Sequence, residues 1–147
     1  MRGFTLTELI VVIGLIGIVA AITLVAINPV AQIKKGNDAR RKSDIRRIQG
    51  ALELYRAEIG VYPPKVGGLP ACGQPLKSPD GTITFLAKIP CDPLGASYYN
   101  GGDYYYNGYT GTRYTLIGCL QNTRDPDGQF IAGGGCTTNY FYFAESP

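Results

Sequence analysis

The sequence contains no histidine and no tryptophan, and none of its four cysteines belongs to a C-x-x-C pair. Without histidine, the chain lacks the side chain that most often changes charge near neutral pH. It also lacks a nucleophile elbow, a phosphate-binding loop and a cluster with metal-ligand spacing. These absences argue against an enzyme, and we expect no cofactor.

Charge is unevenly distributed along the 147 residues, which carry 14 Lys/Arg and 11 Asp/Glu. Residues 1–60 hold nine Lys/Arg and five Asp/Glu, a net +4, whereas residues 61–147 hold five and six, a net −1. We interpret the basic run Arg40–Arg47 as a solvated helix face that Asp38 and Asp44 interrupt. Lipid headgroups, nucleic acid and acidic neighbours in a filament are the alternative partners of this run.

One long apolar run lies near the start of the chain. The 24 residues from Phe4 to Ile27 would form a helix of about 36 Å, which crosses a hydrocarbon core of about 30 Å. Leu9–Ile27 carries no charge at all. The leader 1–3 is short and no small-x-small cleavage site follows, unlike an ordinary secretory signal. We therefore predict a retained membrane helix over residues 4–27.

The distribution of basic residues and the presence of four cysteines predict opposite orientations for this helix. Seven Lys/Arg follow the apolar run closely, and a positive-inside count would place the remaining chain in the cytoplasm. Four cysteines in the Gly- and Pro-rich segment 61–147 instead indicate disulfides in an oxidising compartment. We favour a C-terminal domain outside the cytoplasmic membrane. Of three possible pairings we predict Cys72–Cys91 and Cys119–Cys136, because each joins sequence neighbours and closes a short loop.

A second helical pattern, the outer helix, covers residues 28–60. Its apolar residues recur at spacings of three and four, so they share one helix face. They are Ile45, Ile48, Leu52, Tyr55 and Ile59. Gly60 is a C-cap residue, and prolines follow it closely. The rest of the chain must cover this apolar stripe.

Pro29 is expected to break the helix, because it has no N–H for the carbonyl of Val25 and its ring crowds that carbonyl. In one interpretation the membrane helix ends at Ile27 and a second helix begins near Asp38, after a soft point at Gly36. In the other, this segment is built to stretch. The residues alone leave both interpretations open.

The segment 61–147 is predicted to be β-rich. Residues 63–82 contain five prolines and four glycines, so little regular structure is expected there. Strand-like pieces follow at 103–108, 112–121 and 137–144, with turn-rich stretches between them. The predicted fold class is α+β, with a long N-terminal helix whose outer half packs on a small antiparallel sheet. The seven tyrosines from Tyr98 to Tyr114 are interpreted as packing residues of the sheet, with an adhesive surface as the alternative.

Asp125 and Asp127 are candidate calcium ligands, because they offer hard oxygen atoms beside a glycine. Pro126 lies between them, and the rest of an EF-hand loop is missing. We favour a simple Asp-Pro-Asp-Gly turn and no metal.

The stretch GFTLTELIVVIGLIGIVAA closely resembles the N-terminus of type IV prepilins and type II secretion pseudopilins. In that family a leader ending in Gly precedes a Phe, and a Glu lies four residues after the Phe. Gly3, Phe4 and Glu8 match these positions. IPCDPLG followed by DYYYNG is also similar to the turn and Tyr-rich strand of major pseudopilins.

The resemblance implies that a prepilin peptidase cleaves after Gly3 and that the new amino group of Phe4 is methylated. The globular domain would lie outside the membrane, as the cysteines indicate. Copies of the chain would then leave the lipid bilayer through an inner-membrane assembly platform. They would form a homo-oligomeric helical filament with their apolar helices at its core.

Glu8 is the residue on which this expectation depends most. An unpaired charge in apolar surroundings is costly and marks function by default, so we expect Glu8 to pair with the Phe4 amine of a neighbouring subunit. Its alternative role is an interfacial acid that reaches water. Gly14, Gly17 and Ala21 share one helix face, where small residues let helices approach closely.

Three functions fit the sequence. Our main expectation is the subunit of a type IV pilus-like filament at the cell surface. The alternatives are the major pseudopilin of a type II secretion system, with a periplasmic filament, and a membrane-anchored binding module that never polymerises. Whether nucleic acid is a partner stays open.

Overall fold

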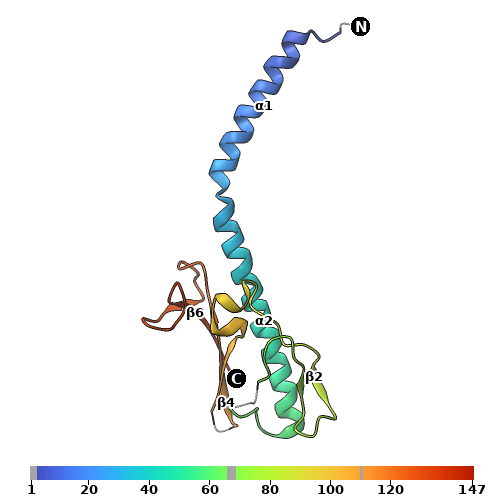
Figure 1. Ribbon diagram of the computed structural model, residues 1–147, viewed down its shortest axis with the longest axis vertical. Coiled ribbons are helices and arrows are strands. Elements are labelled where there is room, and N and C mark those ends of the chain that lie inside the picture. The colour runs from blue at the N-terminus through green and yellow to red at the C-terminus, as the bar shows by residue number, and fades with distance from the viewer. Residues whose placement is uncertain (1–2, 66–68, 110) are drawn as a thin grey trace. The chain divides into compact units, whose positions relative to one another are not determined.

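The structure is a computed structural model that describes residues 3–65, 69–109 and 111–147 (Figure 1). The chain divides into two compact units, Met1–Lys34 and Lys35–Pro147. The first unit contains helix α1 (Leu6–Ile27) and the beginning of helix α2 (Pro29–Ile59). The second contains the rest of α2 and all the strands.

The break between the helices is a single residue, Asn28, which adopts a left-handed conformation with φ 45° and ψ 76°. Pro29 is the first residue of α2. The N–H of a residue at this position has no acceptor within the helix, so the missing N–H of proline costs no hydrogen bond. The Asn28 side chain accepts a hydrogen bond from the Ala31 N–H at 3.2 Å. Of our two interpretations, the one with a new helix start near Asp38 is wrong in that start, because Gly36 and Asp38 lie within continuous helix.

Helix α2 buries the predicted apolar stripe. Ile45, Ile48 and Leu52 are fully buried, and Tyr55 is nearly so. The helix ends before Gly60, which has a φ of 89° and donates its N–H to the Arg56 carbonyl. The periodicity and the C-cap prediction are both confirmed.

The main sheet has four antiparallel strands in the order β3-β4-β6-β5. They are β3 (Tyr105–Tyr109), β4 (Arg113–Cys119), β5 (Gly128–Phe130) and β6 (Tyr140–Glu145). Leu116 pairs with Tyr106 on one side and Ala144 on the other, and all three face the core with α2. The predicted α+β fold is therefore confirmed, with β5 as a strand that we expected to be a connection.

A two-stranded sheet, β1 (Leu76–Lys77) and β2 (Thr84–Leu86), completes the core. Figure 1 shows it on the side of α2 opposite β4 and β6. It falls partly within the Pro-rich stretch where we expected little regular structure. Two short 3-10 helices, η1 (Gly95–Ser97) and η2 (Asn100–Gly102), precede β3.

Strand β6 runs beside α2 in the same direction. Near the start of the domain, Asp38 accepts hydrogen bonds from the backbone N–H groups of Gln121 and Asn122, just after β4. Farther along α2, Gln49 donates to the carbonyl of Glu145, the last residue of β6. The loops around β5 therefore lie at the end of the domain where α2 enters it.

Candidate functional site: the N-terminal segment and the contacts of α2

A capping box begins helix α1. Thr5 is the N-cap: its hydroxyl accepts the Glu8 N–H at 3.3 Å, and its own N–H donates to Glu8 Oε2 at 2.9 Å. The Thr5 hydroxyl lies 2.8 Å from the same Oε2. Two N–H groups that the first helical turn cannot satisfy internally are thus paired reciprocally. The predicted assembly residue Glu8 therefore has a defined carboxylate position before any subunit binds.

The predicted processing residues lie next to this box. Gly3 and Phe4 precede the helix, and the Phe4 side chain is 84% exposed. An open hollow, largely apolar, is lined by Phe4, Thr7, Glu8, Val11 and Val12. The N-terminal segment is therefore accessible to a peptidase and to another copy of the chain.

The small residues of α1 have open space beside them. A Cβ atom at Gly14 or Gly17 would meet no atom within 4 Å, and Ala21 is exposed. Among the described residues none packs beside them, so the predicted packing role of these small residues stays a prediction about contacts between copies.

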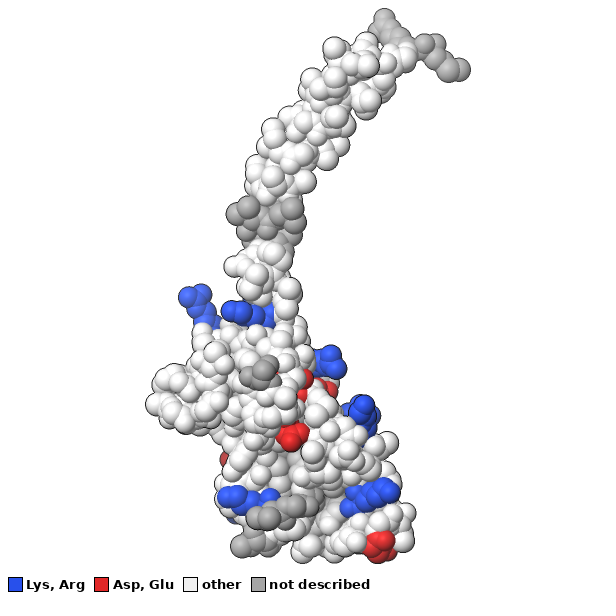
Figure 2. Space-filling model, viewed as in Figure 1, with Lys and Arg blue, Asp and Glu red and all other residues white. Residues whose placement is uncertain are grey.

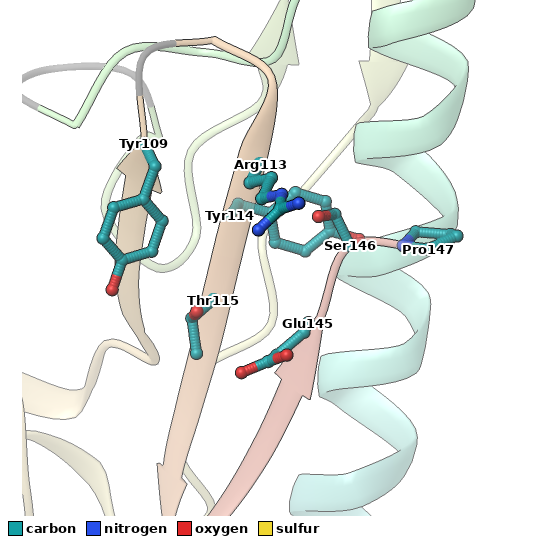
Figure 3. A pocket seen from close by; sticks show the side chains of 7 residues that line it. All are labelled: Tyr109, Arg113, Tyr114, Thr115, Glu145, Ser146 and Pro147. Atoms are coloured by element: carbon teal, nitrogen blue, oxygen red, sulfur yellow. The ribbon is translucent and has the colours of Figure 1, made fainter.

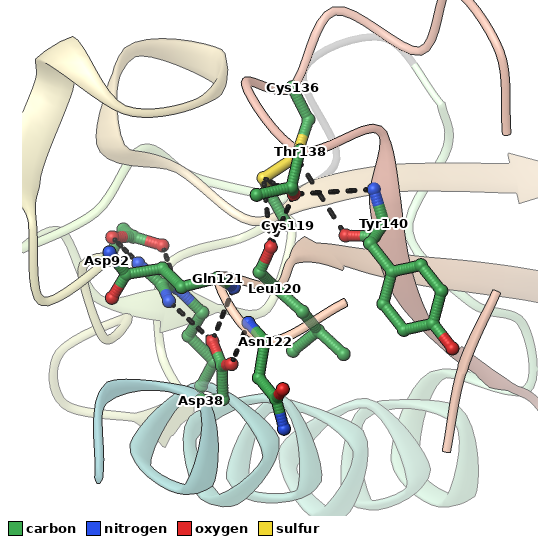
Figure 4. Close-up of a disulfide and its surroundings, with 10 residues drawn as sticks. Asp38, Asp92, Cys119, Leu120, Gln121, Asn122, Cys136, Thr138 and Tyr140 are labelled. Carbon is green, nitrogen blue, oxygen red and sulfur yellow. Dashed lines mark hydrogen bonds and ion pairs between the residues drawn. A yellow bond between two sulfur atoms is a disulfide. The ribbon is translucent and has the colours of Figure 1, made fainter. Parts of the chain in front are cut away.

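A buried ion network holds the first part of α2 to the domain. The Arg41 guanidinium donates from Nε to Asp92 Oδ2 at 2.7 Å, from Nη2 to Asp92 Oδ1 at 2.9 Å, and from Nη1 to Asp38 Oδ1 at 2.7 Å. Arg41 is 0% exposed, and its guanidinium also lies 4.5 Å from the centre of the Tyr98 ring. Figure 4 shows Asp38 facing Gln121 and Asn122, with Asp92 nearby. Our interpretation of the basic run as a solvated face is therefore wrong for Arg41.

The two candidate calcium ligands contact a lysine. Lys42 Nζ lies 2.5 Å from Asp125 Oδ1 and 2.7 Å from Asp127 Oδ2. Burial alone would lower the pKa of Lys42, but these two hydrogen bonds outweigh it and raise that pKa. The segment is also a turn, in which the Gly128 N–H donates to the Asp125 carbonyl. One ammonium group therefore contacts both carboxylates and compensates one of their two negative charges.

The structure joins the cysteines as Cys72–Cys91 and Cys119–Cys136. The first fixes the loop before the small sheet to the segment that carries Asp92. The second ties β4 to the loop before β6 (Figure 4). It packs with Phe141 in a small second core. Each disulfide thus anchors a loop that lacks regular structure.

Most of the tyrosines are packing residues. Tyr104, Tyr106 and Tyr114 are buried, whereas Tyr109 is half exposed. Tyr109 lines a groove at the far end of the domain together with Arg113 and other side chains of β4 and the C-terminal segment (Figure 3). The lining of this groove includes the carboxylate of Glu145 and the guanidinium of Arg113.

Two sequence families match the chain. Residues 1–24 match the "Prokaryotic N-terminal methylation motif", and residues 28–124 match "Type II secretion system (T2SS), protein G". Type II secretion system core protein G of Escherichia coli (strain K12) is 32% identical over 102 residues, which cover 66% of this chain and 69% of that protein. The proteins of the same name from Pseudomonas aeruginosa and Aeromonas hydrophila are 33% and 34% identical, over 65% of this chain and 70% and 69% of theirs. No solved structure matches the chain.

An apolar N-terminal helix with a methylation motif, followed by a helix packed on a small antiparallel sheet, defines a pilin-like protein. Within this class, the chain belongs to the type II secretion system protein G family. The resemblance of the N-terminal segment is confirmed.

Proposed function

We propose that this protein is the major pseudopilin of a type II secretion system, the subunit that repeats along its filament. The match of residues 28–124 to protein G carries this proposal. It favours the secretion filament over the type IV pilus that was our main expectation from sequence. The role is structural, and we propose no catalytic activity for the chain.

In this proposal the precursor is inserted through α1, with its C-terminal domain outside the cytoplasmic membrane. A prepilin peptidase cleaves after Gly3, and the Phe4 amine is methylated. Supporting this order, Gly3 and Phe4 precede the helix, and the methylation motif covers residues 1–24. An assembly platform in the membrane then transfers subunits into the filament.

Glu8 supplies the register of assembly. A carboxylate at the centre of a membrane helix costs on the order of 2.5–3.5 kcal/mol, and less in the first turn, where Glu8 lies. Anchoring does not need this carboxylate, because Leu9–Ile27 is free of charge. Both Thr5 contacts use Glu8 Oε2. The second oxygen can accept the Phe4 amine of an incoming copy while the capping box stays intact. The charge is then neutralised only when two copies have the correct axial offset.

The experiment is to replace Glu8 in a cell that lacks the wild-type subunit. Glu8→Leu should leave membrane insertion and cleavage intact while the yield of sheared filaments falls strongly. Glu8→Asp, which is one methylene shorter, should give an intermediate yield. The membrane pool of processed subunit is the control. A normal filament yield from Glu8→Leu would refute the pairing.

A strain that lacks this protein tests its role in secretion separately from a role in surface pili. Loss of an exported protein from the medium, with surface pili and their motility unchanged, is the expected result. Loss of pili with normal export would restore our original expectation.

A further inference from the structure

Two large apolar side chains at the end of strand β5 are exposed to solvent. Phe130 is 67% exposed and Ile131 is 41% exposed. They belong to ordered backbone, since the Ile131 N–H donates to the Asn139 carbonyl at 2.9 Å. Adjacent large apolar side chains on a domain surface often mark an interaction site.

Strand register places this pair at the end of the domain where α2 enters it. Lys42 Nζ lies 5.7 Å from the centre of the Tyr142 ring, and Tyr142 pairs with Gly128, the first residue of β5. From there β5 runs antiparallel to β6, back toward the beginning of α2. Phe130 therefore lies nearer to that beginning than Lys42 does.

Two exposed cations lie at the same end. Lys35 and Arg124 are exposed, and in the described part of the chain neither forms an ion pair. The neighbouring acids are already engaged: Asp38 contacts Arg41, and the two aspartates of the turn contact Lys42. Figure 2 shows an uncharged lobe at this end of the domain with Lys and Arg side chains beside it.

Only a short stretch of chain links this end of the domain to α1. Lys35 follows the last residue of α1 by eight residues, of which Pro29–Lys35 are helical and span about 10 Å. Beyond the hydrocarbon core, the headgroup layer of a bilayer is about 5–8 Å thick on each side. If α1 spans a bilayer, headgroups are therefore within reach of the domain end.

We infer that Lys35, Arg124, Phe130 and Ile131 form a lipid-docking edge, which rests on the anionic headgroup layer while the subunit waits in the membrane. The cations are attracted to the negative surface, and the two apolar side chains enter the boundary between headgroups and acyl chains. This inference rests on the membrane-anchored precursor of the proposed function and adds a second contact with lipid. Because the edge is small, the docked domain can be released again when the subunit is extracted.

The absence of tryptophan makes a direct test possible. Phe130→Trp introduces a single indole at an exposed position, so the fold should tolerate it. Tyr109→Trp is the matched control, at the opposite end of the domain and 50% exposed. Val12→Trp reports on the membrane helix itself. Each full-length variant is reconstituted in vesicles of phosphatidylcholine with or without phosphatidylglycerol, with brominated lipid in both leaflets as quencher.

We expect the indole at position 130 to be quenched in anionic vesicles and to emit at shorter wavelength, whereas the indole at position 109 stays unquenched. Adding Lys35→Gln to the Phe130→Trp chain should lower the ratio of docked to free domains about fivefold. High salt should do the same.

Three results would overturn the inference. Equal quenching at positions 130 and 109 would show that this end has no preference for lipid. A blue shift that follows the protein-to-lipid ratio and ignores phosphatidylglycerol would assign the edge to contacts between copies. If the indole of Val12→Trp is not quenched, membrane anchoring is refuted, and with it the proposed function. If the indole at position 12 is quenched but the indole at position 130 is not, only the docking edge is refuted.

Discussion

Arg41 and Asp92 lie 51 residues apart in the chain and form a buried, two-pronged ion pair. Asp92 directly follows Cys91, so the pair and the Cys72–Cys91 disulfide together fix one loop to α2. Breaking a buried pair is costly, because the remaining charge loses its partner in surroundings that solvate it poorly. This network therefore secures the point where the helix joins the globular domain.

Arg41→Met should lower the free energy of unfolding by about 3–5 kcal/mol, because it leaves the carboxylates of Asp38 and Asp92 without their cation. Arg40→Met is the matched control. Arg40 is exposed, and its ion pair with Asp44 is long, at 4.0 Å. The loss of Arg40 should therefore cost at most about 1 kcal/mol. Urea unfolding of the full chain in detergent, followed by circular dichroism, measures both. Equal midpoints for the two variants would contradict the buried network.

Local periodicity predicted much of the fold. Ile45, Ile48 and Leu52 follow a helical spacing, and each could be assigned to the buried face from its neighbours alone. Arg41 carries no such signal, because it stands beside Arg40 in one basic run. Its burial depends on Asp92, and sequence spacing does not reveal which distant loop will supply a partner. Sequence therefore located the N-terminal methylation motif but missed the contacts that hold α2.

Strand β5 was missed for a related reason. Gly128–Phe130 is short, and it follows a Pro- and Gly-containing turn that is typical of a connection. It becomes a strand because β6 offers a free edge. The helix break was predicted at the right place, since Pro29 acts through its immediate neighbours, whereas the expected restart at Asp38 ignored the domain contacts that keep that turn helical.

Asp80 should titrate at unusually low pH. The Ser78 hydroxyl and the Thr82 N–H and hydroxyl donate to its carboxylate and lower its pKa to about 2. Because the folded pKa lies below the unfolded value, this stabilisation is present above about pH 4 and is lost as the pH falls toward 2. NMR titration of the Asp80 carboxyl carbon measures the midpoint. Ser78→Ala should raise it, and an unchanged midpoint would exclude the hydroxyl as its cause.

Two glycines of the sheet should differ in their tolerance of alanine. A Cβ at Gly108 would lie 2.7 Å from the Pro63 carbonyl oxygen, which belongs to the backbone. At Gly118 its closest neighbour would be the end of the Ile45 side chain at 2.8 Å, with the Tyr104 ring at ordinary contact distance. We expect Gly108→Ala to cost about 1–3 kcal/mol and Gly118→Ala less. Gly50→Ala, with open space in α2, should stabilise by about 0.5–1 kcal/mol. Thermal unfolding ranks the three variants, and a Gly118 variant less stable than the Gly108 variant would reverse our assignment.

Lys42 should determine how the turn at Asp125 responds to calcium. Because its ammonium contacts both Asp125 and Asp127, calcium or a chelator should leave the melting temperature of the wild-type chain unchanged. Lys42→Met leaves two neighbouring carboxylates without a cation, so it should lower stability at low salt, and added calcium should restore part of the loss. Lys34→Met, which removes an exposed charge, controls for net charge. A wild-type chain that calcium stabilises would show that the ion displaces the lysine.

The last prediction concerns Thr5, which holds the Glu8 carboxylate through its hydroxyl and its backbone N–H. Thr5→Val keeps the shape and the N–H but removes the hydroxyl, so the cap weakens by about 1 kcal/mol and the carboxylate is held by one contact where it had two. Glu8 then samples more orientations, and an incoming amine must restrict them during assembly. Filament yield should therefore fall, though less than in Glu8→Leu, while Thr5→Ser, which restores the hydroxyl, should assemble normally. Membrane level and cleavage after Gly3 should be unchanged in both variants, which separates assembly from processing. If Thr5→Val assembles as well as the wild type, the position of the carboxylate before docking is irrelevant, and only its charge contributes to register.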